Sequence, residues 1–143
     1  MRIRLDGRPA KSVTPKDLIL YLIGQIGGSG SLGYAVEFAG EPIGSMGMEG
    51  RLTVCNMGVA LGASFTMIAP DEMTFDYLRG RRLAPQGDRL VRALAKWRAL
   101  KSDDGAVLDL VPHRMTPLTL RPDRPEIMHL ITRSIARLNP KCK

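Results

Sequence analysis

The sequence has few of the residues that build disulfide frameworks or metal centres. Among 143 residues, cysteine occurs only as Cys55 and Cys142, and histidine only as His113 and His129. No CxxC and no cysteine–histidine spacing typical of zinc is present. The small number and the spacing of these residues therefore argue against a disulfide-stabilised protein and predict no metal site within the chain itself.

Long apolar runs are also missing. No stretch reaches the roughly 18 apolar residues that a helix needs to cross a bilayer. The opening residues MRIRLDGR alternate charged and apolar side chains, unlike the apolar core of a secretory signal. We therefore expect a cytoplasmic protein with no membrane partner. The hydrophobic fraction of 44% is enough for one modest domain with a real core.

Acidic residues become scarce towards the end of the chain. The formal net charge is +7, with 7 basic and 2 acidic residues in 113–143 against 14 and 12 in 1–112. Such a basic tail could attract RNA, but it has no aromatic side chain on which bases could stack. A solvated extension is favoured, and nucleic acid is not the expected partner. Five prolines interrupt the segment from Pro112 onward, and only residues 126–138 carry a helical apolar stripe.

The apolar pattern predicts alternating strands and helices. Thr14 is a good N-cap for the first helix, with Asp17 three residues later. Glycines 27 and 28 end that helix, and the glycine-rich turn after it lacks the lysine and the order of a phosphate loop. Strands are predicted at 2–5, 34–38, 65–69 and 106–111, and helices at 15–26, 46–62, 71–79 and 88–101. This alternation predicts an α/β sheet that is at least partly parallel, with helices on its faces.

The helix predicted at 46–62 has an unusual composition. Each glycine costs roughly 1 kcal/mol relative to alanine on an exposed helix. So many glycines indicate that another backbone or a ligand comes close. The glycines are Gly47, Gly50, Gly58 and Gly62. The apolar residues expected to bury one side are Leu52, Cys55, Met57 and Val59.

Five stretches carry a resemblance to a known family: VTPKDLILYLIGQIG, GYAVEFAGEPI, SMGMEGRLTVCNM, APDEMTFDYLRGR and WRALKSDDGAVLDLV. Residues 1 to about 112 resemble the large subunit of 3-isopropylmalate dehydratase, in the aconitase superfamily. The motif MEGRxTVCNM is specific to that family. The resemblance implies an α/β protein, a fragment of the three-layer α/β/α fold of the aconitase iron-sulfur domain. Residues 113–143 form a basic, proline- and arginine-rich tail outside the resemblance.

The resemblance also implies a reaction. The family isomerises isopropylmalate in leucine biosynthesis by removing and adding water at a [4Fe-4S] cluster, which three cysteine thiolates hold. Cys55 matches a cysteine that is not a cluster ligand, and Asn56 matches an asparagine beside the cluster and substrate. Ala60 stands where the family has an active-site glutamate. We therefore expect no catalytic residue, no metal ligand and no cofactor on this chain alone.

Three hypotheses follow from these observations. The first is a truncated, inactive copy of the dehydratase large subunit, which in its intact form takes a small hydroxy-acid substrate. The second is an assembly module that docks a dehydratase small subunit without catalysis. The third is weak RNA binding through the basic tail.

Overall fold

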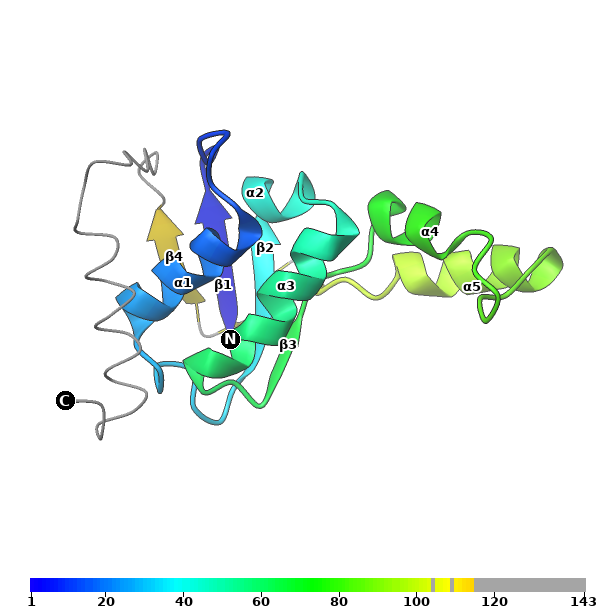
Figure 1. Cartoon of the computed structure of the whole chain (residues 1–143). Helices are drawn as coiled ribbons and strands as arrows, with labels where there is room; N and C mark the ends of the chain where they lie inside the picture. Colours follow the sequence, from blue (N-terminus) through cyan, green and yellow to red (C-terminus); the bar gives the residue numbers. More distant parts are fainter. Residues whose placement is uncertain (104, 109, 115–143) are drawn as a thin grey trace. The chain divides into compact units, whose positions relative to one another are not determined.

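The computed structural model describes residues 1–103, 105–108 and 110–114 (Figure 1). The chain divides into two compact units. Unit 1 comprises Met1–Ile68 with the residues from 109 onward, and unit 2 comprises Ala69–Leu108. The helical stripe predicted at 126–138 and the residue Cys142 lie outside the described residues. Within those residues, no helix combines the length and apolarity needed to cross a bilayer.

Unit 1 is built on a parallel sheet, which confirms the predicted α/β class. The strand order is β3-β2-β1-β4, and Ile3 of β1 lies opposite Phe38 of β2 and Val111 of β4. The last strand begins at Leu110 and not at Ala106 as predicted, because its pairing with β1 starts at Leu110. The strands are β1 (Arg2–Asp6), β2 (Ala35–Gly40), β3 (Phe65–Met67) and β4 (Leu110–Arg114).

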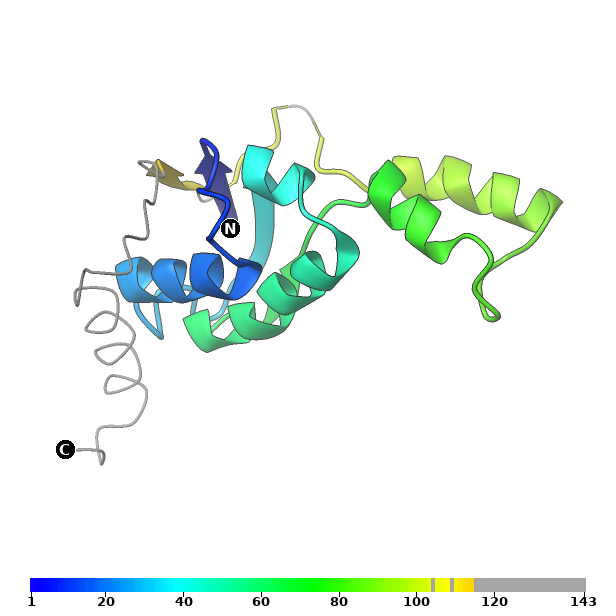
Figure 2. The ribbon, with the colours of Figure 1, turned by 45° about the horizontal axis from the view of Figure 1, so that its top comes forward.

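Helix α1 (Pro15–Ile26) forms the first crossover between parallel strands. Its start is a capping box, in which the Thr14 side chain accepts from the backbone N–H of Asp17 and the Asp17 carboxylate accepts from Thr14. This confirms the predicted N-terminus. Figures 1 and 2 show α1 and a second helix, α3 (Met48–Gly58), side by side on one face of the sheet. Between them and the sheet lies the core, which includes Ile3, Leu5, Leu18, Ile19, Leu22, Ile23, Val36, Phe38 and Val54.

The opposite face of the sheet carries polar and exposed apolar side chains among the described residues. Arg2 and Glu37 lie opposite each other in the β1–β2 register, and the Arg2 Nη2 to Glu37 Oε2 distance is 3.0 Å. Phe65 and Met67 of β3 are exposed on the same face, 68% and 47%. Strand residues on this face therefore alternate with the core residues, as the period of a β-strand requires.

The segment predicted as one helix at 46–62 consists of two elements, α3 (Met48–Gly58) and a 3₁₀ turn, η1 (Val59–Leu61). The short helix α2 (Glu41–Gly44) precedes this segment. The predicted buried side of this segment was wrong, because Leu52 and Val59 are 48% and 58% exposed and Cys55 and Met57 are only partly buried. The residues of α3 that face the core are Arg51, Val54 and Gly58.

Glycines decide which face of α3 turns inward. A Cβ on Gly58 would lie 2.6 Å from Thr66 Cγ2 and 3.0 Å from a Phe38 ring carbon. A Cβ on Gly50 would lie 2.5 Å from Met46 Cγ and 2.9 Å from Pro15 Cγ. Only a residue without a side chain allows α3 to approach the sheet and the start of α1 this closely. The prediction of a close approach holds at these two positions, but side chains make it and not the predicted backbone or ligand.

Unit 2 is a pair of helices, α4 (Glu72–Leu78) and α5 (Asp88–Arg98). The Asp71 carboxylate caps α4 by accepting from the backbone N–H of Thr74 at 3.3 Å. Phe75 is buried and stacks with Trp97 of α5, with ring centroids 6.3 Å apart. The helix predicted at 88–101 is shorter in the structure, because it ends at Arg98, and Leu100 is 63% exposed.

Candidate functional site

The two site positions predicted from the sequence lie at the end of α3. Asn56 is exposed on the helix, on the same side as Leu52 and Val59. Ala60 follows in the 3₁₀ turn, where it is partly buried and packs against the core. The chain changes from α-helix to 3₁₀ turn after Gly58, so Asn56 is exposed to solvent whereas Ala60 contacts the core. The open face of α3 therefore presents one amide between apolar side chains.

Cys55 lies on α3 beside strand β3. The Thr66 hydroxyl donates to the Cys55 carbonyl oxygen at 2.6 Å, which ties the helix to the strand. The side chain is half-buried, and burial raises the pKa of the Cys55 thiol, while a hydrogen bond with Thr66 partly opposes that shift. Burial disfavours the charged thiolate. Cys55 is therefore held as a neutral thiol at neutral pH.

We expect Cys55 to react slowly with iodoacetamide in the folded protein. Its pKa lies above the ordinary value of 9.0, so the rate should rise only at a pH above that of an unfolded cysteine. By linkage, the neutral thiol favours the folded state below the unfolded pKa, and this contribution is lost as the pH rises through the folded pKa. The measurement is a pH–rate profile on the Cys142→Ser variant, with and without urea. Equal rates in both states would contradict the assignment.

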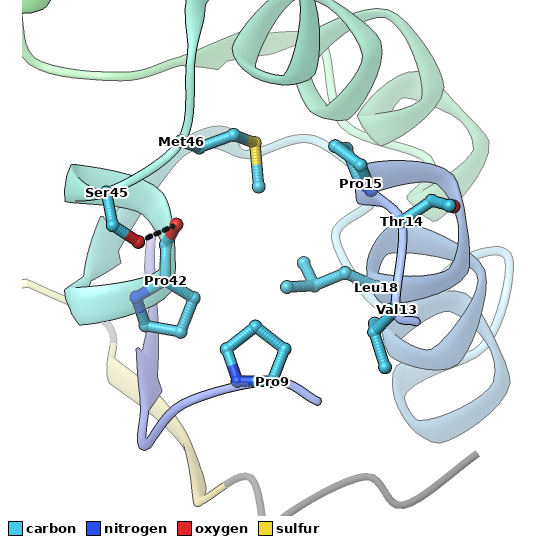
Figure 3. Close-up of a pocket in the computed structure, with 8 residues that line it drawn as sticks. All are labelled: Pro9, Val13, Thr14, Pro15, Leu18, Pro42, Ser45 and Met46. Atoms are coloured by element: carbon cyan, nitrogen blue, oxygen red, sulfur yellow. Dashed lines mark hydrogen bonds between the residues drawn. The ribbon is translucent and has the colours of Figure 1, made fainter. Parts of the chain in front are cut away.

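A cavity of about 170 Å³ opens at the carboxyl ends of β1 and β2. Its residues come from the loop after β1, the start of α1, and α2 with the link to α3. In Figure 3, Leu18, Pro9 and Met46 point into the cavity. The Ser45 hydroxyl donates to the Pro42 carbonyl oxygen at 3.2 Å, so its proton is already used. The cavity therefore offers an apolar lining.

An adjoining hollow of about 280 Å³ shares Pro9, Pro42 and Ser45 with this cavity. At its rim the Arg8 Nε donates to Glu41 Oε1 at 2.6 Å, and this hydrogen bond raises the pKa of Arg8 further. Both side chains are exposed at 87% and 51%. The pair balances the two charges at this rim, and because both side chains are exposed it contributes little to stability.

Arg51 holds the connection that lines the cavity. The residue is 3% exposed, and its guanidinium donates to the carbonyl oxygens of Met46 at 2.9 Å and Gly44 at 3.0 Å. A buried cation is stable only when its donors are bonded in this way. Sequence reasoning missed both Arg51 and the cavity. The signal for the cavity was the placement of Pro9 and Pro42 just after two adjacent parallel strands, where open α/β sheets form crevices.

Comparison of the sequence with known proteins places this chain in a family. The model of the aconitase family (aconitate hydratase) matches residues 1–138. The chain belongs to the aconitase family. Over 109 residues it is 56% identical to 3-isopropylmalate dehydratase large subunit 1 of Bradyrhizobium diazoefficiens, covering 76% of this chain and 23% of that protein. Over 113 residues it is 51% identical to the 3-isopropylmalate dehydratase large subunit of Bacteroides fragilis, covering 79% and 24%.

This aconitase-family chain spans about a quarter of the length of the curated relatives it matches. The described residues do not fit a [4Fe-4S] cluster, which takes thiolate ligands from several cysteines. They contain one cysteine, Cys55. No group of three or more His, Cys, Asp or Glu that could hold a metal ion occurs among the described residues.

Proposed function

We propose that this chain supplies part of the scaffold, and not the catalytic groups, of a hydro-lyase of the 3-isopropylmalate dehydratase type, and that it is inactive by itself. The identity of residue 60 carries the proposal. Alanine there can neither accept a proton nor bind a metal, whereas the resemblance implies a glutamate at this position. The cysteine content supports the same conclusion, because the described residues contain one cysteine, Cys55, and the resemblance matches it to a cysteine that is not a cluster ligand.

In this proposal Asn56 is the residue of α3 that contacts substrate or cluster in an intact large subunit. Its exposure and its place on the open face of α3 support this role. The apolar neighbours Leu52 and Val59 are left for other parts of an intact subunit to cover. The relatives are named large subunits, so the proposed partner of the intact protein is a dehydratase small subunit. The proposed compartment is the cytoplasm.

The test is anaerobic reconstitution of the purified chain with ferrous iron and sulfide. After desalting, we expect no visible absorbance from a bound cluster and no dehydration of 3-isopropylmalate, with or without a dehydratase small subunit. The full-length large subunit of Bradyrhizobium diazoefficiens, treated in parallel with its small subunit, serves as the control for the procedure. A stable cluster with measurable turnover on the chain alone would refute the proposal.

A further inference from the structure

Unit 2 contains a cavity of its own, whose lining includes neither Asn56 nor Ala60. It has a volume of about 350 Å³ and lies between the end of α4, the connection to α5, and α5 itself. Most of its lining is apolar, and Leu83 at its rim is 87% exposed. The residues that shape it include Tyr77, Leu78, Arg81, Leu83, Pro85 and Trp97. An open apolar cavity with one cationic group is suited to an apolar side chain that has a carboxylate beside it.

Arg81 is held in place at this cavity before any ligand arrives. Its guanidinium carbon lies 4.0 Å from the centroid of the Tyr77 ring, and its Nε donates to the Tyr77 carbonyl oxygen at 3.1 Å. In the described part of the chain, the two terminal nitrogens of Arg81 have no hydrogen-bond or ion-pair partner. A guanidinium fixed by stacking leaves a planar pair of donors that matches a carboxylate.

The surface around the cavity is strongly basic. Residues 77–101 contain eight Arg and Lys residues and one acidic residue, Asp88. Two of the eight are neutralised within unit 2, Arg79 by Asp76 and Arg98 by Glu72. The other six have no ion-pair partner among the described residues: Arg81, Arg82, Arg89, Arg92, Lys96 and Lys101. Charge complementarity therefore favours an acidic partner.

Each aromatic ring at this cavity already has one contact within unit 2. The Tyr77 ring is covered by Arg81, and Trp97 stacks on the buried Phe75. Arg98 lies over the same Phe75 ring at 5.4 Å. Base recognition without sequence preference uses open aromatic faces. The arrangement at this cavity therefore favours an acidic polypeptide over single-stranded RNA.

We propose that unit 2 binds an acidic segment of a partner protein, which inserts a bulky apolar side chain into this cavity and places a carboxylate on Arg81. The apolar side chain contacts Leu83 and Pro85, and the flanking carboxylates lie near the unpaired basic residues of α5. Binding of this kind couples a small apolar anchor with charge attraction. It does not require residues of unit 1.

The proposal is tested with the full chain and a fluorescein-labelled peptide, EEDFLDEE, by fluorescence anisotropy. We expect a Kd on the order of 10–100 μM at moderate salt. The Arg81→Gln variant should bind at least about tenfold more weakly, and Arg81→Lys should also lose affinity because ammonium lacks the planar fork. Lys16→Gln, which removes the same charge from an exposed site in unit 1, should leave the Kd within about twofold. Circular dichroism and the fluorescence of the single tryptophan, Trp97, verify folding.

Four results would overturn the proposal. One is the absence of binding up to about 1 mM peptide. Another is equal binding of the peptide EEDSSDEE, because charge alone would then account for the affinity. The third is a single-stranded RNA oligonucleotide that binds more tightly and displaces the peptide, because the basic surface would then be a nucleic-acid surface. Unchanged binding by Arg81→Gln, with folding intact, has the same consequence.

Discussion

Ala60→Glu is expected to restore activity by two or more orders of magnitude when this chain replaces the matching segment of a complete dehydratase. The recipient is the large subunit of Bradyrhizobium diazoefficiens, which is 56% identical over 109 residues. The graft that carries Ala60 should lose about 10²–10⁴-fold in kcat, the usual contribution of a positioned acid or base. The same graft with Ala60→Glu should regain most of that loss. Both are measured as 3-isopropylmalate dehydration with the small subunit present.

The environment of position 60 supports this expectation. Ala60 sits in the 3₁₀ turn just after α3 and is partly buried, whereas the neighbouring Val59 is 58% exposed. A side chain at position 60 starts from a fixed backbone, so its carboxylate is positioned with little loss of freedom. The matched control is Val59→Glu in the same graft, which adds a carboxylate one residue earlier and should restore nothing. Full activity of the graft with Ala60 would show that the glutamate is dispensable.

Gly40→Ala is expected to prevent stable folding of unit 1. Gly40 ends β2 with φ +107°, a conformation that side chains rarely adopt, and it lies opposite Leu5 of β1. A Cβ at this position would lie 1.8 Å from the Leu5 carbonyl oxygen. Backbone atoms of two paired strands cannot separate without breaking the sheet. The free energy of unfolding should fall by more than about 3 kcal/mol, measured by urea denaturation followed by circular dichroism.

Gly44→Ala is the control for this substitution. Gly44 lies in the short helix α2, and a Cβ there would meet nothing within 4 Å. Alanine should leave the stability unchanged or raise it slightly, since it restricts the unfolded chain. If Gly40→Ala and Gly44→Ala unfold at the same urea concentration, the close approach of β1 and β2 at Gly40 is not a constraint on folding.

Local signals in the sequence predicted the elements of unit 1 well. The pairing of Thr14 with Asp17 predicted the start of α1 correctly, and Gly27 ends that helix as expected. The inward face of α3 could not be found in the same way. Hydrophobicity pointed to Leu52 and Val59, whereas packing against the sheet selected Gly58 and hydrogen bonding selected Arg51.

The site and the charge distribution show a second limit. Asn56 and Ala60 were identified from the resemblance, but the contrast in their exposure depends on the 3₁₀ turn, which the sequence pattern did not indicate. Charge was averaged over residues 1–112, where acidic and basic residues nearly balance. The average hid the basic segment at 77–101, because the acidic residues that offset it lie elsewhere in the sequence.

The position of β1 between β2 and β4 has a consequence for synthesis on the ribosome. Arg2 of β1 pairs with Leu110 of β4. One edge of β1 therefore has no partner strand until nearly all of the described chain has been translated. At about 5–20 residues per second, the residues between the end of β2 and the end of β4 take about 4–15 s to make. During that time the edge of β1 that will pair with β4 has backbone amides and carbonyls without hydrogen-bond partners. Such an edge can pair with the wrong strand, and a chaperone could bind there.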